Sequence, residues 1–335
     1  MKKLISLTMC AVITAALLTG CGTKSNTSLG KNNDKLKIVT TIFPEYDWVE
    51  NIMGDKAKNA EVTMLLDNGV DLHSYQPTAS DMMKIATCDM FIYVGGESDA
   101  WVDDALKDIE NKDMVVINLL DVLGDKVKEE EVVEGMQEEC ETDENEEAHD
   151  HEDEDEVEYD EHVWLSLKNA SALCGEITEQ LCKIDEKNAE TYRANFAVYD
   201  NKIKELDNKY TETIKESEKH TLLFGDRFPF RYLTDDYGLD YYAAFVGCSA
   251  ETEASFETIV FLAKKVDELN LPAILTIEGS DGKIADTIRA NTEKAKPEML
   301  QLNSIQSVTS KDVKNGVNYL SIMEDNLKVV EEALK

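Results

Sequence analysis

The chain has 335 residues, of which 42% are apolar, and a formal net charge of −35 at pH 7. Its length is enough for two domains of ordinary size with their own hydrophobic cores. The negative charge excludes nucleic acid as a partner, because binding to phosphates needs clustered Lys and Arg. A cation is the ligand that such a charge favours, although most acidic surfaces only keep a protein soluble.

The N-terminus predicts a bacterial lipoprotein signal. Two lysines precede a mostly apolar stretch, residues 4–18, which is too short for a comfortable transmembrane helix. The stretch ends in the sequence LTGC, in which small residues come directly before Cys21. We therefore expect cleavage of residues 1–20, lipidation of Cys21 and an extracytoplasmic chain that residues 21–35 tether to the cell membrane. An ordinary signal peptide that happens to contain a cysteine is the alternative.

Alternating strand and helix patterns follow between residues 36 and 118. Short apolar runs such as LKIVTT and DMFIYV predict strands at residues 36–41, 62–66, 89–94 and 114–118. Amphipathic runs predict helices at residues 45–53, 80–87 and 100–108. Strands that alternate with helices indicate parallel βαβ packing, so we expect a first α/β lobe over residues 36–166.

A strongly acidic segment, residues 129–161, interrupts this lobe. It contains 20 Asp or Glu and no Lys or Arg. Such a composition cannot bury enough surface to offset the entropy lost on ordering, so we expect disorder there. His149 and His151 lie within the segment, which favours a flexible loop that collects metal weakly. The alternative is a solvated polar segment with incidental histidines.

A long helical pattern follows at residues 167–217. Apolar residues recur there at the helical period, with a break near residues 183–186, and no proline occurs. The second part of this stretch, roughly 30 residues, would form a helix about 45 Å long. A helix of that length between two α/β regions would be a rigid strut rather than a flexible linker.

Residues 218–335 predict a second α/β lobe. Strands are expected at residues 221–224, 241–246, 273–277 and 300–302, and helices at residues 230–236, 255–269, 284–293 and 317–334. Two lobes joined by one rigid helix would form a clamshell. In open α/β sheets ligands bind beyond the carboxyl ends of the strands, so we expect a site in the cleft between the lobes.

Two of the five histidines are candidate metal ligands. His73 follows the second expected strand, at its carboxyl end, and His162 lies just before the long helical stretch. Each histidine alone would more often be a hydrogen-bonded structural residue, and we interpret His220 in that way. Placed together at one edge of the cleft, His73 and His162 indicate a metal site, because neutral imidazole is a common ligand of zinc and its neighbours.

The cysteines and a search for known catalytic motifs give little further information on function. No CxxC occurs, which excludes a zinc knuckle or a redox pair, and we interpret most of the remaining cysteines as small buried apolar residues. No HExxH or GxSxG motif is present, so we expect no enzymatic activity.

The order of motifs resembles the zinc and manganese solute-binding lipoproteins of ABC transporters. GVDLHSYQPTASDM, YVGGESDAW, the acidic His-bearing segment, EHVWL and FRYLTDDYGL occur in that order and cover essentially the whole mature chain. The resemblance implies two (β/α)4-type lobes with parallel sheets, a rigid backbone helix and a metal in the cleft. It also implies a monomer that delivers this metal to an ABC permease and its ATPase.

The resemblance assigns ligands to positions of this sequence. His73 matches the first histidine of the family, and His162 matches the second. The third ligand of the family, a His or Glu, falls on Arg227, which has no lone pair to donate to a metal. Asp226 could substitute for it, or Arg227 could pair with a carboxylate that faces the cleft.

The fourth ligand and the identity of the metal stay open at this point. Glu278 and Asp281 are the candidates from the second lobe, and His149 or His151 could also complete the site. Two histidines with one or two carboxylates satisfy neither tetrahedral zinc nor octahedral manganese uniquely. The His-bearing segment favours zinc, with manganese as the alternative. A further alternative is an anionic small molecule or a metal chelate that binds Arg227.

Overall fold

The computed structural model describes residues 35–136, 158–249 and 253–335. Residues 35–335 form one compact unit. The predicted signal peptide, Cys21, residues 21–34 of the tether and residues 137–157 of the acidic segment, with His149 and His151, lie outside the described residues. The prediction of disorder over the whole of residues 129–161 is wrong at the two ends of that segment, because Glu129 forms an antiparallel bridge with Tyr159 and Glu161 is buried.

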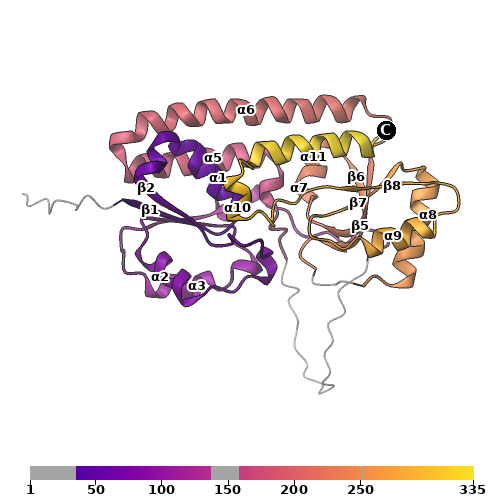
Figure 1. The fold of residues 1–335 in the computed structure, drawn as a ribbon, viewed down its shortest axis with the longest axis horizontal. Helices are drawn as coiled ribbons and strands as arrows, with labels where there is room; N and C mark the ends of the chain where they lie inside the picture. Colours follow the sequence, from indigo (N-terminus) through magenta and orange to yellow (C-terminus); the bar gives the residue numbers. More distant parts are fainter. Residues whose placement is uncertain (1–34, 137–157, 250–252) are drawn as a thin grey trace, which may run out of the picture. The chain divides into compact units, whose positions relative to one another are not determined.

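The N-terminal lobe is built on a parallel sheet with strand order β2-β1-β3-β4. Its strands are β1 (Leu36–Thr40), β2 (Ala60–Met64), β3 (Met90–Tyr93) and β4 (Val115–Asn118). The connecting helices are α1 (Phe43–Met53), α2 (Ala79–Thr87), α3 (Val102–Ala105) and α4 (Leu119–Leu123). Helix α1 lies on one face of the sheet, and α2 and α3 lie on the other (Figure 1). Strands covered on both faces have apolar side chains at consecutive positions, as the buried pair Ile38 and Val39 shows.

The C-terminal lobe repeats this architecture with strand order β6-β5-β7-β8. Its strands are β5 (Thr221–Phe228), β6 (Asp240–Val246), β7 (Ala273–Thr276) and β8 (Glu298–Gln301). Its helices are α7 (Arg231–Tyr237), α8 (Phe256–Leu269) and α9 (Lys283–Ala290). Strand β5 continues four residues beyond its predicted end, through a register shift between Phe224 and Arg227. This extension carries the chain to the edge of the sheet that faces the first lobe.

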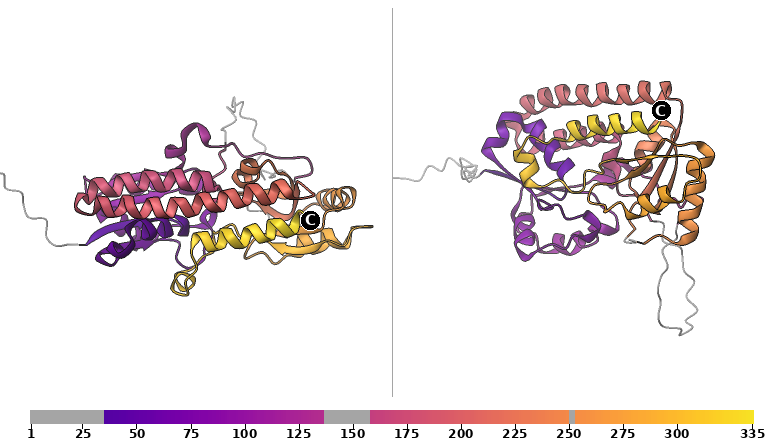
Figure 2. Two further views of the ribbon diagram at one scale, coloured as in Figure 1. Left: turned by 90° about the horizontal axis from the view of Figure 1, so that it is seen from above. Right: turned by 45° about the vertical axis from the view of Figure 1, so that its right-hand side comes forward.

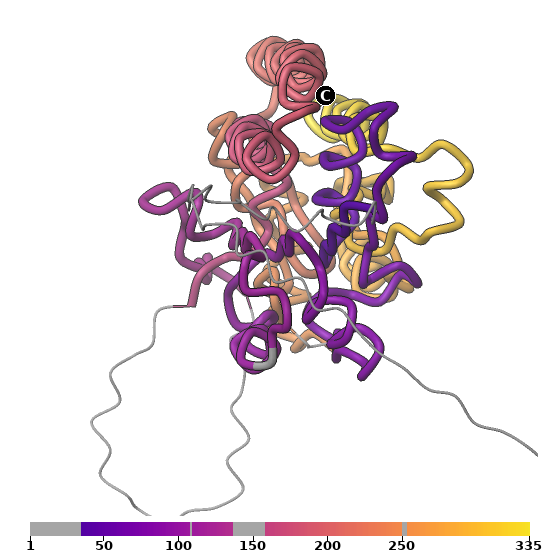
Figure 3. Tube along the Cα trace, turned by 90° about the vertical axis from the view of Figure 1, so that its left-hand side faces the viewer, coloured from indigo at the N-terminus to yellow at the C-terminus, as the bar shows by residue number. Residues whose placement is uncertain are grey.

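A layer of helices spans both lobes. It contains α5 (Leu167–Ile184), α6 (Ala189–Glu216) and α11 (Tyr319–Ala333), with the short α10 (Ser310–Lys314) before α11. Helix α6 has 28 residues and runs past both sheets (Figure 1). Seen from above, α6 lies between α5 and α11 (Figure 2), and the end-on view shows α1 beside this layer (Figure 3). The predicted break between the two helices is real and lies at residues 185–188.

One continuous hydrophobic core joins the two lobes. It includes both faces of the N-terminal sheet, the helical layer and one face of the C-terminal sheet. A second, smaller core lies between the other face of the C-terminal sheet and helices α8 and α9. Buried polar contacts reinforce the junction, since Trp164 Nε1 donates to the Ser304 carbonyl over 2.8 Å and Tyr319 Oη donates to the Trp164 carbonyl over 2.6 Å. A wide opening of the lobes would break this core, so only small motions are compatible with the fold.

The predicted fold class is confirmed, with two parallel α/β lobes and a long helix shared between them. The predicted lobe boundaries stay a prediction. The C-terminal helices also contact the N-terminal lobe, because Ser310 at the start of α10 donates its backbone N–H to the Asp67 carbonyl over 2.8 Å. In the part of the chain that the structure describes, no helix is both long enough and apolar enough to span a bilayer.

Asp47 connects three helices at the base of the N-terminal lobe. Its carboxylate, on α1, accepts hydrogen bonds from Tyr199 Oη of α6 over 3.1 Å and from the Tyr319 backbone N–H of α11 over 3.2 Å. Burial raises the pKa of Asp47 from 3.8 to about 6, although these two hydrogen bonds lower it. The helical layer is therefore anchored on a carboxyl group that is costly to ionise.

We expect an Asp47→Asn variant to lose part of the pH dependence of stability. The native state holds the Asp47 proton more tightly than the unfolded chain does, so this contribution is complete below about pH 4 and is lost as the pH rises through about 6. Since one pKa unit corresponds to about 1.4 kcal/mol, the wild-type free energy of unfolding should fall by up to about 3 kcal/mol across that window relative to the variant.

Urea unfolding at a series of pH values measures this difference. Asp325→Asn, an exposed change on helix α11, is the control and should keep the wild-type pH dependence of the free energy of unfolding. If Asp47→Asn kept the wild-type pH dependence of the free energy of unfolding, the raised pKa of Asp47 would not be the cause of that dependence.

Candidate metal centre

His73 is held by a carboxylate two residues before it. It lies in a 3₁₀ turn (Leu72–Ser74) in the loop after β2, at the carboxyl end of that strand. Asp71 Oδ1 accepts the His73 backbone N–H over 3.1 Å and lies 2.6 Å from His73 Nδ1. Since the carboxylate only accepts, Nδ1 carries the proton and Nε2 keeps its lone pair.

His162 is held in the same way. It precedes the 3₁₀ turn Val163–Leu165, just before α5, and its side chain is completely buried. Asp160 Oδ1 accepts the His162 backbone N–H over 2.8 Å and lies 3.1 Å from His162 Nδ1. The two histidines thus share one local arrangement, Asp-x-His, which leaves both Nε2 atoms available as ligands.

The two imidazoles converge on one point between the lobes. Their ring centroids are 5.2 Å apart with an interplanar angle of 35°. Neither His73 Nε2 nor His162 Nε2 has a hydrogen-bond partner among the described residues, although both atoms are buried. Buried polar atoms are normally paired, so two unpaired nitrogens that face each other indicate a place for a cation.

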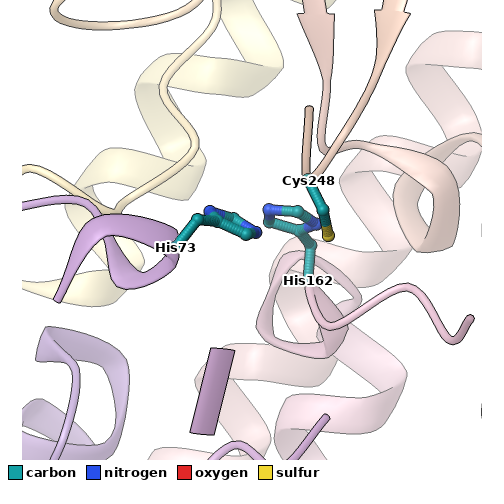
Figure 4. Close-up of side chains that lie close together, drawn as sticks. All are labelled: His73, His162 and Cys248. Atoms are coloured by element: carbon teal, nitrogen blue, oxygen red, sulfur yellow. The ribbon is translucent and has the colours of Figure 1, made fainter. Parts of the chain in front are cut away.

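Cys248 of the C-terminal lobe completes a cluster with these histidines. It follows β6, and one donor atom from each of His73, His162 and Cys248 lies within 4.8 Å of the others (Figure 4). The Cys248 backbone N–H donates to Glu130 Oε1 over 3.1 Å, which fixes the loop. Gly247 permits the approach, because a Cβ there would lie 3.0 Å from His162 Cε1.

Glu161 adds a buried carboxylate beside the cluster. Its Oε1 accepts the Ser98 backbone N–H over 2.8 Å, while its Oε2 has no hydrogen-bond partner in the described part of the chain. Glu161 Oε2 lies 3.8 Å from His73 Nε2. Gly96 makes room for this side chain, since a Cβ at that position would lie 2.3 Å from Glu161 Oε1.

The site is strongly negative and its groups are perturbed accordingly. A pocket of about 240 Å³ opens onto it and is lined by His73, Glu97, Ser98, Glu130, Glu158, Tyr159, Glu161 and Cys248. Burial lowers the pKa of His162, but Asp160 and then Glu161 more than offset this, so that the pKa is raised. Burial raises the pKa of the Cys248 thiol, and the charges of Glu130 and Glu161 raise it further. The nearby carboxylates thus raise both pKa values, and a bound cation would offset their negative charge.

Arg227 forms an ion pair between the lobes instead of binding a metal. It lies near the end of β5, and its Nη2 is 2.7 Å from Asp71 Oδ2, the carboxylate that also holds His73. Its Nη1 donates to the Ser249 carbonyl over 3.4 Å. Burial raises the pKa of Asp71, but His73 and Arg227 outweigh burial and hold that pKa well below its usual range. Of the two roles considered for Arg227, pairing with a carboxylate of the cleft is the one that the geometry shows.

The three carboxylates predicted from the C-terminal lobe lie outside this cluster. Asp226 accepts the backbone N–H groups of Arg227 and Ile277 over 2.9 and 3.3 Å. Glu278 accepts three hydrogen bonds from the loop after β8, from Ser304 N, Ser304 Oγ and Gln306 N. Asp281 is 60% exposed and pairs with Lys283. Each carboxylate is therefore engaged in hydrogen bonds or an ion pair within the C-terminal lobe.

Sequence reasoning missed Cys248 and Glu161. Cys248 was counted among the small buried apolar residues, and its loop carries no metal motif. A signal did exist for the histidines and for Glu161, because Asp71-Leu72-His73 and Asp160-Glu161-His162 repeat one Asp-x-His pattern. No comparable signal marks Cys248, whose position depends on the pairing of β5 with β6.

The chain is similar to known zinc-uptake and zinc-binding proteins. A family model described as zinc-uptake complex component A, periplasmic (ZnuA), matches residues 38–333. The chain is 32% identical over 319 residues to the high-affinity zinc uptake system protein ZnuA of Bacillus subtilis, covering 95% of this chain and 94% of that relative. It is 31% identical over 332 residues to the zinc-binding lipoprotein AdcA of Streptococcus pneumoniae, covering 99% of this chain and 61% of the relative. The chain thus spans about three fifths of the length of that streptococcal relative.

A solved structure shows the same fold. The crystal structure of the Zn(II)-bound ZnuA-like domain of Streptococcus pneumoniae AdcA has a TM-score of 0.67 and 28% identity, and the match covers 90% of this chain and 99% of that domain. The family resemblance noted from the motifs is confirmed, as is the expectation that the family is not one of enzymes. The match over residues 38–333 shows that the chain belongs to the ZnuA family of zinc-uptake components.

Proposed function

We propose that this chain captures zinc outside the cytoplasm and delivers it to an ABC importer. The observation that carries the proposal is the pair of buried, unpartnered Nε2 atoms of His73 and His162 at the junction of the lobes. Zinc is bound by neutral imidazole with a metal–nitrogen distance of about 2.0–2.1 Å, and the Asp-x-His turns hold both rings in the form that this bond needs. The names of the relatives, a zinc-binding lipoprotein and a zinc uptake protein, support the same cation.

The surroundings of the site suit the capture of a cation. The pocket in front of the histidines is lined by Glu97, Glu130, Glu158 and Glu161, and a cleft lined by one sign of charge concentrates counter-ions. Arg227 already pairs with Asp71, so its guanidinium has an internal carboxylate partner. This contact favours metal over the alternative of an anionic small molecule.

Release to the importer would require only a small displacement of the lobes. The continuous core limits wide motion, while the Arg227–Asp71 ion pair and the contacts of the Cys248 loop can separate at lower cost. We further propose that the chain is a monomer anchored through lipid on Cys21, and that a membrane permease with its ATPase receives the metal. The signal-like N-terminus supports the anchor, and the family supports the importer.

We expect one zinc ion per chain in equilibrium dialysis, and we expect His73→Ala to weaken this binding by about 100-fold or more. The reason is that loss of an outer hydrogen-bond partner alone costs roughly 10–100-fold in metal affinity, and a direct ligand should cost at least as much. His162→Ala should behave in the same way.

His220→Ala is the matched control, because His220 is exposed and lies outside the cluster. It should bind zinc as the wild type does. If the wild-type chain bound no zinc at all, the proposal of a metal site would be wrong, and an anionic ligand at Arg227 would become the better candidate.

We expect Asp71→Asn to weaken zinc binding by roughly tenfold, at the lower end of the range for an outer-shell carboxylate. The amide could still accept the His73 Nδ1 proton, but it would lose the charge that supports the bound cation and pairs with Arg227. Competition with a chromophoric chelator measures the change.

Asp281→Asn serves as the comparison, since Asp281 is exposed and pairs with Lys283. Its zinc affinity should equal that of the wild type. A loss of affinity in Asp281→Asn with none in Asp71→Asn would favour the ligand assignment made from the sequence.

A further inference from the structure

We propose that Cys248 is the metal ligand supplied by the C-terminal lobe, and that its sulfur makes the site prefer zinc over manganese. This inference rests on the proposed zinc capture and names the ligand that decides which metal is taken. Neither the family match nor the names of the relatives assigns a cysteine to the site.

The donor atoms around the sulfur are buried and unpaired. Cys248 Sγ belongs to the cluster in which all three donor atoms lie within 4.8 Å of one another. His162 Nε2 is on a completely buried side chain and Glu161 Oε2 is on one that is 2% exposed, and neither atom has a hydrogen-bond partner among the described residues. A buried polar group without a partner destabilises the fold, and a cation is a partner that all of these lone pairs could share.

Cys248 lies next to the position at which the family resemblance expects the third ligand. The family resemblance places the third ligand on Arg227, near the end of β5, where a guanidinium cannot bind metal. Strand β6 is the parallel neighbour of β5, and Phe228 is paired with Val246 at their ends. Cys248 therefore lies two residues beyond that pair, on the adjacent loop at the same edge of the sheet. The hydrogen bond from Arg227 Nη1 to the Ser249 carbonyl ties the two loops together.

The charges around the cluster favour a bound dication. Arg227 brings a positive charge close to the cluster, and Asp71 compensates it at 2.7 Å. A Cys248 thiolate and the Glu161 carboxylate would offset the charge of a dication, and Asp160 beside His162 and Glu130 beside Cys248 add further negative charge. On binding, the metal–sulfur bond forms as the S–H bond breaks, and the proton leaves to water.

The chemistry of sulfur sets the preference. Zinc forms tetrahedral sites with N, S and O ligands, with bonds of about 2.0–2.1 Å to nitrogen and about 2.3 Å to sulfur, which places the ligand atoms roughly 3.5 Å apart. The three donor atoms lie within 4.8 Å of one another, so each separation needs to shorten by roughly 1 Å at most to reach that spacing. Manganese prefers carboxylates and water in an octahedral shell, whereas soft thiolates favour zinc. A site of two imidazoles and one thiolate, with the Glu161 carboxylate beside it, therefore discriminates against manganese.

Cobalt(II) is the direct probe of the sulfur. It takes tetrahedral zinc sites, and a cobalt–thiolate bond produces a ligand-to-metal charge-transfer band in the near ultraviolet. We expect this band in the wild-type chain and its loss in Cys248→Ser, with the visible bands of tetrahedral cobalt retained in both. Cys182→Ser, a buried change on α5 outside the cluster, and Cys140→Ser, in the acidic segment, should keep the charge-transfer band.

Chelator competition with zinc and with manganese measures the preference. Cys248→Ser should lose about 100-fold or more in zinc affinity and little in manganese affinity, so that the ratio of the two falls by a similar factor. Cys248→Asp should keep the negative charge but shift the preference toward manganese.

The possible outcomes separate this inference from the proposed function. A wild-type chain that binds zinc tightly without a thiolate band, or a Cys248→Ser variant with unchanged zinc affinity, would overturn the role of Cys248 alone. Absence of zinc binding in the wild type would overturn both. Should Cys248→Ser fail to fold, the spectrum of wild-type cobalt protein compared with Cys140→Ser and Cys182→Ser still decides the point.

Discussion

Two carboxylates that orient two imidazoles with buried Nε2 atoms are the constraint on which the site depends. Asp71 and Asp160 each accept both the backbone N–H and the ring Nδ1 proton of the histidine two residues later. This arrangement fixes the tautomer and the ring plane together, so that both Nε2 lone pairs face one point. The rings do not have to be ordered when a metal arrives, which reduces the entropy that binding would otherwise cost. The same carboxylates strengthen the imidazoles as ligands and hold negative charge near the metal.

The scaffold keeps this point between two lobes that cannot separate far. Helix α6 crosses both sheets, and the hydrophobic core continues from one lobe into the other through the helical layer. Polar contacts cross the cleft, and the Arg227–Asp71 ion pair is one of them. Hydrophobic burial thus resists wide opening, while polar contacts at the site can exchange with water at low cost. The proposed capture and release of a metal would need both a rigid scaffold and weak contacts at the site.

The departure at Arg227 shows how a parallel sheet can supply a ligand from another strand. The carboxyl ends of neighbouring strands meet at one edge, so the loops after β5 and β6 reach the same volume. Arg227 binds Asp71, and Cys248 of the C-terminal lobe offers a donor atom within 4.8 Å of both histidines. A carboxylate or imidazole at Arg227 would remove the ion pair and change the charge of the site. The charges of Cys248, Arg227, Asp71 and Glu161 therefore depend on one another.

The sequence by itself determined the class of the fold and half of the candidate site. Local hydrophobic periodicity was enough to place the eight strands to within a few residues, and the rarity of histidine pointed to His73 and His162. Helices α4 and α10 were missed because five residues are too few to show a helical period. Strand β2 lies slightly earlier than predicted because its register is set by pairing with β1, with Leu36 opposite Ala60.

Only the tertiary structure decided which groups surround the two histidines. Cys248 is distant from His73 and His162 in the chain and becomes their neighbour through the pairing of β5 with β6 and the packing of the lobes. Nothing in the local sequence separates it from the other cysteines, because its chemistry depends on what lies within a few ångströms. Asp226, Glu278 and Asp281 illustrate the converse, since these carboxylates lie close to the expected ligand positions in the sequence but pair with other groups of the C-terminal lobe. Spacing along the chain specifies secondary structure, whereas a metal site depends on distances between side chains that only the folded chain fixes.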